Sequence, residues 1–358
     1  MDFSNLLSEL LEKKNRLQQF SGVVLIKHGT DELFKAAYSD AHKSWEIKNQ
    51  IDTRFRIASV SKLFTAVAIL QLIDDQKINL GTRIIDCLGL EDTTIPSAVT
   101  IEHLLTMTAG IADWFDESGN SAEDWAALCH EYPIYQFRRN EDYLPLFAHK
   151  TPVTSVGQQH QYNNASYILL GLAIAKLSGL LYFDYVKTHI FVKLGMTNSD
   201  FVALDGIDKN VAEGYIPLTN TEEKIIGWRK NIYSATPEAA ADGGAISTVE
   251  DLARFTHALR TGQLLSAEMT SAILSPKVLE DDEPYEGYFW KYGYGNQFLE
   301  DESGRIVRWG HTGEEEGVSC RLYHYPQKDI DIIILANQSE CAGSLGWEIH
   351  DLIFEHIA

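Results

Sequence analysis

Segments with the character of β-strands stand at both ends of this chain of 358 residues, and segments with helical character stand between them. Near the N-terminus, leucines at helical spacing over residues 6–17, with Ser4 as the expected cap, precede an apolar run at residues 22–27 that is typical of a buried strand. A turn at residues 28–31 and a return strand at residues 33–38 complete a predicted hairpin. The chain is therefore predicted to open with a helix and a hairpin.

The C-terminal end repeats the strand character. Three segments share it, at residues 306–309, 318–325 and 329–335, and residues 344–357 favour a closing helix. Helical patterns dominate the middle instead, at residues 101–106, 125–130, 165–177 and 183–194. Strand-forming ends around a helical block predict an α+β fold. We expect one unit, in which residues 1–80 and 241–358 form an α/β lobe, residues 81–240 form an inserted helical lobe, and a cleft lies between the lobes.

Charge and hydropathy exclude several classes of protein. Asp and Glu number 51 against 30 Lys and Arg, so the net charge of −21 would repel a polyanion or an anionic membrane surface. The longest apolar stretch, residues 167–175, is too short to span a bilayer. Charged residues from Glu9 onward interrupt the N-terminal helix, where a signal peptide needs an unbroken apolar core. We expect a cytoplasmic protein that binds neither nucleic acid nor membrane, in an oligomeric state that the sequence leaves open.

Cysteine and histidine patterns support neither a disulfide framework nor a metal site. The four cysteines (Cys87, Cys129, Cys320 and Cys341) are widely spaced and form no CxxC pair. The twelve histidines form no HExxH or clustered ligand pattern. We expect reduced structural thiols, no metal and no cofactor.

One SxxK pattern occurs in the chain, from Ser59 to Lys62, and it opens an apolar stretch with helical spacing that continues to Ile73. Residues three apart share a helix face, so the Lys62 amine can lie beside the Ser59 hydroxyl. The positive end of the helix dipole favours an alkoxide there and disfavours an ammonium, as activation of a nucleophile requires. Because Ser and Lys are common, a single SxxK means little alone.

Two YxN patterns follow. Tyr162-Asn163-Asn164 lies directly before the helix predicted at residues 165–177, where the helix dipole stabilises a phenolate and makes Tyr162 a candidate proton relay. In an extended segment, the Asn164 side chain would lie on the same face as that of Tyr162. The rival, Tyr294-Gly295-Asn296, lies in an aromatic and glycine-rich segment that favours a structural role. We therefore prefer the first pattern.

The third pattern is His311-Thr312-Gly313, on the strand that enters from Ile306. A polar side chain, a hydroxyl and a glycine that permits close backbone approach suit pairing with an extended acyl substrate. A similar Thr261-Gly262 follows a helical segment, so its glycine is expected to end that helix.

The order SxxK, YxN, HTG resembles the serine penicillin-recognising superfamily, in the branch of class C β-lactamases, soluble DD-carboxypeptidases, D-aminopeptidases and related esterases. Further stretches are similar to that family: residues 100–110 (TIEHLLTMTAG), 243–248 (GGAIST) and 292–295 (YGYG). The resemblance implies a β-lactamase/transpeptidase-like α+β fold, with an antiparallel sheet flanked by N- and C-terminal helices and an inserted helical lobe.

The resemblance also implies catalytic roles for three residues. Ser59 would be the acylated nucleophile, and Lys62 its activating partner. Tyr162 would relay protons in the steps that involve the leaving group and, later, water.

Binding roles are implied for a second set of residues. Asn164 would bind the substrate amide, and the strand of His311, Thr312 and Gly313 would line the site. The backbone N–H groups of Ser59 and Glu314 would form the oxyanion hole, in which one donor is typically worth about 10²–10³ in rate.

Departures from the family pattern narrow the expected activity. The second motif is YxN and not SDN, and no deacylating Glu of the class A type is found. Where β-lactamases carry lysine in the third motif, this chain has His311, as soluble DD-carboxypeptidases and D-aminopeptidases do. A neutral imidazole lacks the fixed charge that would hold a penicillin or peptide carboxylate, so weak or no β-lactamase turnover is expected.

The run Glu314-Glu315-Glu316 stands where the family usually has small or apolar residues. One interpretation is a solvated turn. The other is an acidic rim that repels carboxylates and favours neutral or amine-bearing substrates. In either case three adjacent carboxylates are expected to raise the pKa of His311 above its usual value of about 6.5.

Two hypotheses of function follow. The first is a serine hydrolase that cleaves a small-molecule ester, amide or short peptide through an acyl-enzyme at Ser59, as an esterase, D-aminopeptidase or DD-peptidase. The second is a non-catalytic, penicillin-recognising binding or sensory module. Intact Ser59, Lys62 and Tyr162 favour the enzyme.

Overall fold

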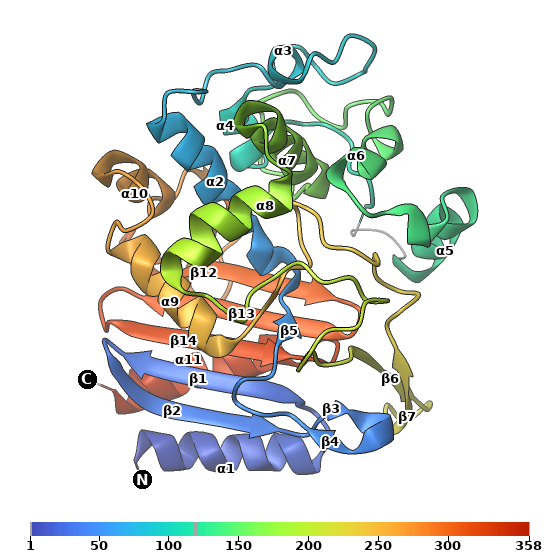
Figure 1. The fold of residues 1–358 in the computed structure, drawn as a ribbon. Coiled ribbons are helices and arrows are strands. Elements are labelled where there is room, and N and C mark those ends of the chain that lie inside the picture. The colour runs from blue at the N-terminus through green and yellow to red at the C-terminus, as the bar shows by residue number, and fades with distance from the viewer. Residues whose placement is uncertain (1, 117–120, 358) are drawn as a thin grey trace.

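An antiparallel sheet of eight strands, in the order β2-β1-β14-β13-β12-β11-β10-β9, forms the base of the molecule (Figure 1). The structure is a computed structural model that describes residues 2–116 and 121–357. Strands from the two ends of the chain meet inside the sheet, where β1 (Gly22–His28), next to the edge strand, pairs antiparallel with β14 (Ile330–Ala336) along its full length. The predicted α+β fold, with one antiparallel sheet built from both termini, is confirmed.

Six more strands complete the large sheet: β2 (Asp31–Tyr38), β9 (Val278–Leu279), β10 (Tyr288–Tyr292), β11 (Gln297–Asp301), β12 (Ile306–Glu315) and β13 (Val318–Tyr325). Three small ribbons lie outside it: β3 (Asp40–His42) with β4 (Ile47–Lys48), β5 (Phe55–Arg56) with β8 (Ile246–Ser247), and β6 (Tyr215–Thr219) with β7 (Ile225–Lys230). All five predicted strands are present. The β6–β7 hairpin within the predicted helical block is not predicted by the sequence, because its strands are partly exposed and lack a clear apolar alternation.

The α-helices are α1 (Phe3–Arg16), α2 (Lys62–Asp74), α3 (Ile84–Leu88), α4 (Ile101–Leu105), α5 (Ser121–Glu131), α6 (Asn140–Tyr143), α7 (Asn164–Ser178), α8 (Tyr182–Val186), α9 (Val249–Arg260), α10 (Ala267–Ile273) and α11 (Ala342–His356). Short 3₁₀ turns are η1 (Lys43–Trp45), η2 (Ala58–Ser61), η3 (Ile134–Gln136) and η4 (Leu144–Leu146), and η5 (Lys187–Val192) is a π-helical segment. The helix predicted at residues 183–194 is thus divided between α8 and η5.

Ser4, expected to cap the first helix, lies inside α1 instead. Asp2 holds the N-cap position, and the Ser4 hydroxyl donates to the carbonyl oxygen of Leu33 on β2 at 2.7 Å. The hydroxyl therefore ties α1 to the edge strand of the sheet. Thr261-Gly262, the pair that is similar to the third pattern, follows α9 as expected, with Gly262 at a φ of 68°.

Alternating side chains of the central strands divide the apolar core into two clusters. Val24 and Ile26 pack with α1 and α11 on one face, whereas Val23 and Leu25 pack with the larger cluster that includes α2, α7 and α9 on the other. Figure 1 shows α1 below the sheet and the helices α2 to α8 gathered above it. The division into two lobes at residues 80 and 240 stays a prediction.

Among the described residues, no single helix is long and apolar enough to cross a bilayer. Only α7 taken together with Tyr182–Val192 meets that test of length and composition, and this pair is bent by 76°. The four cysteines are free in the structure. The predicted cellular location stays a prediction.

Candidate active site

Ser59 lies on the 3₁₀ turn η2, which leads directly into α2, so the predicted position at a helix N-terminus is confirmed. The residue before it, Ala58, has a φ of 43°, in the left-handed region that non-glycine residues rarely adopt. The carbonyl oxygen of Ala58 accepts the N–H of Gly244 at 3.2 Å, which helps to hold this conformation. Ser59 reaches a cavity of ≈ 640 Å³, which Asn164 and Glu314 also line.

Lys62 is fully buried, and its Nζ lies beside three oxygen atoms. It is 2.9 Å from Ser59 Oγ, 2.7 Å from Asn164 Oδ1 and 2.6 Å from the backbone oxygen of Asp242. An ammonium can donate to all three. A neutral amine keeps two N–H groups for Asn164 and Asp242 and turns its lone pair to the Ser59 hydroxyl. The same geometry therefore serves the amine before and after it takes the proton of Ser59.

Asn164 is the first residue of α7, and a buried carboxylate holds it there. Asp113 accepts the backbone N–H groups of Asn164 and Ala165 at 2.7 and 2.9 Å, and that of Trp114 at 2.7 Å. Burial outweighs these donors and, together with the charge of Asp242, raises the pKa of Asp113 to about 7. Asp113 thus fixes the helix end from which Asn164 reaches Lys62.

The ring of Tyr162 lies over the Lys62 amine, with Nζ 4.9 Å from the ring centroid. The rival Tyr294 is buried elsewhere, and its hydroxyl donates to Glu102 at 2.9 Å. The structure therefore brings Tyr162, and not Tyr294, to the Ser59–Lys62 pair. Its role as proton relay stays a prediction.

The third motif lies on the part of β12 that no longer pairs with β11. β11 begins at Gln297, opposite Gly310, and the Gln297 side chain accepts the N–H of Thr312 at 3.0 Å. Alternate residues of a strand direct their N–H groups to the same edge, so the Glu314 N–H is directed to the side that β11 has left open. A Cβ at Gly313 would come within 2.3 Å of the oxygen of Ile57, so only glycine allows this contact between β12 and the Ser59 segment.

His311 is completely buried, and it does not line the cavity. Its Nδ1 must donate to the carbonyl oxygen of Thr312 at 2.6 Å, so the neutral ring accepts from the Tyr292 hydroxyl through Nε2 at 3.1 Å. Burial, with the positive charges of Lys62 and Arg321, lowers the pKa of His311 to about 3. The expectation that neighbouring glutamates raise this pKa is wrong, because desolvation opposes the imidazolium and those carboxylates are engaged elsewhere.

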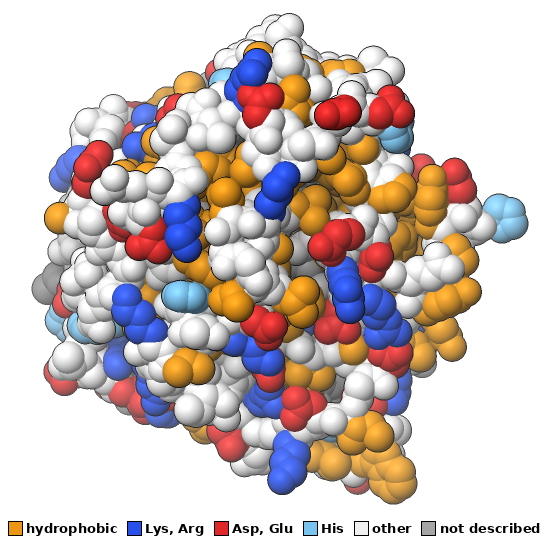
Figure 2. Space-filling view, turned by 45° about the horizontal axis from the view of Figure 1, so that its top comes forward, with side chains coloured by type: hydrophobic (Ala, Val, Ile, Leu, Met, Phe, Trp, Pro, Cys, Tyr) orange, Lys and Arg blue, Asp and Glu red, His pale blue; other side chains and the backbone are white. Residues whose placement is uncertain are grey.

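The three glutamates line the cavity, but two of them are paired with arginine. Glu315 forms an ion pair with Arg56 at 2.6 Å, and Glu314 with Arg321 at 2.6 Å. Glu316 is exposed and accepts from Ser339 Oγ at 3.3 Å. The run is therefore neither a plain solvated turn nor a uniform acidic rim. Figure 2, which looks onto the helical side, shows acidic and basic side chains next to one another with hydrophobic side chains between them.

Sequence patterns missed several residues that shape the site. Five aromatic residues also line the cavity and are here called the aromatic wall: Trp114, Phe115, Trp125, Tyr143 and Tyr233. Trp125 Nε1 donates to the oxygen of Tyr233 at 3.0 Å and so joins α5 to the segment after β7. Asp242 accepts from Trp114 Nε1 at 2.9 Å in addition to its backbone contact with Lys62. Its place directly before the Gly243-Gly244 stretch was the available signal.

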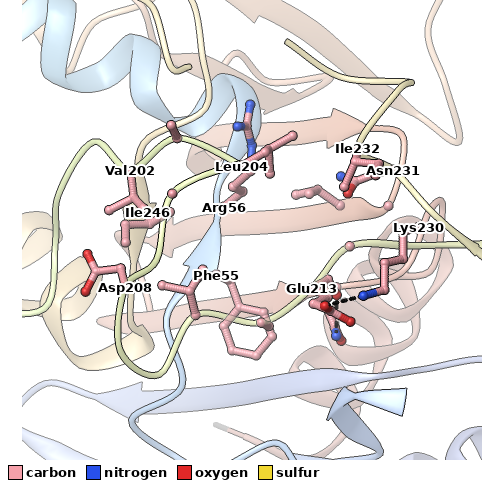
Figure 3. Close-up of a pocket in the computed structure, with 18 of the residues that line it drawn as sticks. Phe55, Arg56, Val202, Leu204, Asp208, Glu213, Lys230, Asn231, Ile232 and Ile246 are labelled. Carbon is pink, nitrogen blue, oxygen red and sulfur yellow. Dashed lines mark hydrogen bonds and ion pairs between the residues drawn. The ribbon is translucent and has the colours of Figure 1, made fainter. Parts of the chain in front are cut away.

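A second cavity of ≈ 430 Å³ lies beside β5 (Figure 3). Phe55, Val202, Leu204 and Ile246 supply apolar lining, and Glu213 and Lys230 form an ion pair at its edge. Arg56 lines both cavities. No residue predicted for the site lines this second cavity.

Comparisons with known proteins agree with this architecture. Residues 6–346 match the family model described as Beta-lactamase. A penicillin-binding protein of Bacillus subtilis (strain 168) is 28% identical over 352 residues, which cover 93% of this chain and 72% of that protein. The crystal structure of a penicillin binding protein from Bacillus halodurans is similar with a TM-score of 0.84 and 34% identity, over 97% of this chain and 98% of that chain. A D-amino acid amidase from Ochrobactrum anthropi SV3 shares the fold, with a TM-score of 0.74 at 20% identity over 100% and 99% of the two chains.

Proposed function

This chain belongs to the β-lactamase family of serine hydrolases, and from that premise we propose that it cleaves an ester or amide of a small molecule or short peptide through an acyl-enzyme at Ser59, with weak or no turnover of β-lactams. The observation that carries the proposal is the position of the Lys62 amine, 2.9 Å from Ser59 Oγ and held by Asn164 and Asp242. Because Lys62 is fully buried, its amine is placed to act on the serine and the groups around it.

Acylation begins when Ser59 Oγ attacks the carbonyl carbon and its proton passes to Lys62 Nζ. The oxyanion that forms lies between the N–H of Ser59, next to the N-terminus of α2, and the N–H of Glu314 at the open edge of β12. These fixed dipoles stabilise the negative charge without reorganisation. The Asn164 amide, oriented by its contact with Lys62, binds the substrate beside the reacting carbonyl.

Tyr162 completes the proton path. Its ring lies against the Lys62 amine, so its hydroxyl can pass a proton from that amine to the leaving oxygen or nitrogen. In the second half of the reaction the same groups take a proton from the attacking water and return the hydrogen to Ser59. The balance closes with one water consumed and no cofactor.

The environment of His311 supports weak activity on β-lactams. Both ring nitrogens are engaged inside the protein, and the lowered pKa keeps the ring neutral. The third motif therefore offers no cation to a penicillin carboxylate. The aromatic wall, defined by Trp114, Phe115, Trp125, Tyr143 and Tyr233, favours an apolar or aromatic acyl group.

One observation favours a second candidate, a carboxypeptidase of the DD-peptidase type. Arg229 lines the cavity and is exposed, and among the described residues no carboxylate lies within 4 Å of its guanidinium. It could hold the terminal carboxylate of a short peptide. The choice between this activity and an esterase or D-aminopeptidase is an outcome of the assay below.

The test is a substrate panel with the wild-type protein and Ser59→Ala: p-nitrophenyl esters, D-amino-acid anilides, a D-Ala-D-Ala peptide and nitrocefin. We expect turnover of an ester or amide that Ser59→Ala abolishes, and little turnover of nitrocefin. Intact-mass measurement after a fluorophosphonate should show one adduct, on Ser59. No turnover and no adduct would favour a non-catalytic binding module.

A further inference from the structure

Arg56 and Glu315 form a two-point ion pair across the two segments that carry the proposed oxyanion donors. Arg56 Nε lies 2.6 Å from Glu315 Oε1, and Nη2 lies 3.2 Å from Oε2. Arg56 stands shortly before Ser59 in the chain, and Glu315 directly follows Glu314. Paired N–H···O bonds of this kind fix orientation as well as distance.

A dedicated slot holds the guanidinium. The Arg56 side chain is only 5% exposed, and a Cβ at Gly244, which has a φ of 88°, would come within 2.7 Å of Nη2. Figure 3 shows the guanidinium extending away from Phe55 and from the ion pair of Glu213 with Lys230. Among the described carboxylates, Glu315 is the partner within 4 Å. Burying this charge without its partner would be costly.

The end of β12 needs an interaction of this kind to fix its position. Glu315 is the last residue of the strand, it pairs only with Val318 of β13, and the chain then reverses through Gly317 at a φ of 81°. β11 does not extend to this part of β12 in the described structure. The Glu314 N–H therefore sits at a strand end with one neighbour, whereas an oxyanion donor must be held within about 0.5 Å of its productive position.

We propose that Arg56 and Glu315 are positioning residues that set the separation of the Ser59 and Glu314 N–H groups. This inference rests on the proposed acyl-enzyme at Ser59. It gives the unusual glutamate run a role that is neither solvation nor repulsion of substrate. Neither side chain touches the reacting atoms, and both act through the backbone beside them.

The experiment measures acylation of wild type, Glu315→Gln and Arg56→Lys from the p-nitrophenolate burst, with a neutral p-nitrophenyl ester and the matching thionoester. Glu315→Gln keeps an acceptor but loses the charge, and Arg56→Lys keeps the charge but loses the fork. We expect each to lower the acylation rate for the ester about tenfold, with KM changed less than about twofold. The thionoester sulfur accepts hydrogen bonds from the oxyanion donors poorly, so the thionoester depends less on their position. The ratio of ester rate to thionoester rate should therefore fall several-fold in both variants.

Glu250→Gln is the matched control, because it removes an ion pair with Lys35 at 2.7 Å between α9 and β2, away from the cavity. All rates are normalised to folded active sites by titration, and thermal unfolding is recorded for each variant. If the two variants acylate like the control, or lose ester and thionoester rates by the same factor, the inference is wrong. A wild-type protein that shows neither ester turnover nor a Ser59 adduct would overturn the proposed function, and this inference with it.

Discussion

Lys62 Nζ and Ser59 Oγ lie 2.9 Å apart in a pocket that solvent does not reach on the lysine side. Since the two groups act on one proton, Ser59→Ala and Lys62→Ala should each remove nearly all turnover, and the double variant should lose little more than either one. Steady-state kinetics on the best ester of the panel test this. Another group would be the base if Lys62→Ala kept more than a tenth of wild-type kcat. That limit corresponds to a rise of about 1.4 kcal/mol in the activation free energy.

Tyr162 and Tyr294 offer an internal comparison. Tyr162→Phe should lower kcat by roughly 10²–10⁴ without loss of fold, because it removes the hydroxyl of the proposed proton relay and keeps the ring. Tyr294→Phe should keep kcat and lower the free energy of unfolding, by about 1 kcal/mol, because it removes the hydrogen bond to Glu102. Kinetics and chemical denaturation of both variants test this. The reverse pattern would mean that Tyr294 serves the reaction.

Features that depend on local sequence were predictable. The spacing of Ser59 and Lys62 needs only one helical turn to bring the side chains together, and strands such as β1 and β14 consist mostly of apolar residues. The position of Tyr162 is also a local feature, because α7 begins at Asn164, two residues further along the chain.

Features that depend on distant pairing were not predictable. Asp113 caps α7 from a loop far earlier in the chain, and its sequence neighbours do not distinguish it from a surface carboxylate. Arg56 and Glu315 belong to different sheets, so neither residue type nor spacing indicates their pairing. The neutral state of His311 required knowledge of its burial, since nearby sequence charge suggested the opposite.

His311 should not titrate between pH 5 and 8, because burial lowers its pKa to about 3. Its ring should keep the Nδ1–H form, with Nε2 bonded to Tyr292. Two-dimensional ¹⁵N NMR of labelled histidine, recorded across that pH range, tests this. A His311 ring that gains a proton near pH 6.5 would contradict the buried neutral state.

Asp113 should make the protein less stable as pH rises. Its pKa is raised from 3.8 to about 7, so the folded state binds a proton that the unfolded state has released between these values. Stability from this group is present at low pH and is lost as pH rises to about 7, with a slope of up to about 1.4 kcal/mol per pH unit. Asp113→Asn should remove this slope from urea unfolding curves between pH 5 and 8.

Two other variants sharpen that measurement. Glu280→Gln should likewise reduce the loss of stability with rising pH, because burial also raises the pKa of Glu280 to about 7. Asp205→Asn should leave the slope unchanged, because its pKa is lowered by Arg138 and lies below the measured range. An Asp113→Asn curve parallel to that of wild type would show that the carboxyl is ionised throughout.

Glu316 is the glutamate of the run that can act on substrate through its charge. Glu315 is neutralised by Arg56 and Glu314 by Arg321, whereas no described Lys or Arg lies within 4 Å of Glu316. Exposed charges are screened beyond about 8 Å at physiological salt, so Glu316→Lys should lower KM several-fold for a carboxylate-bearing ester at low salt and much less at high salt. KM for a neutral ester should not change. Glu9→Lys, on the exposed face of α1, makes the same change in net charge on the opposite side of the sheet. If the two variants change KM alike for both esters, the charge of Glu316 does not select substrates.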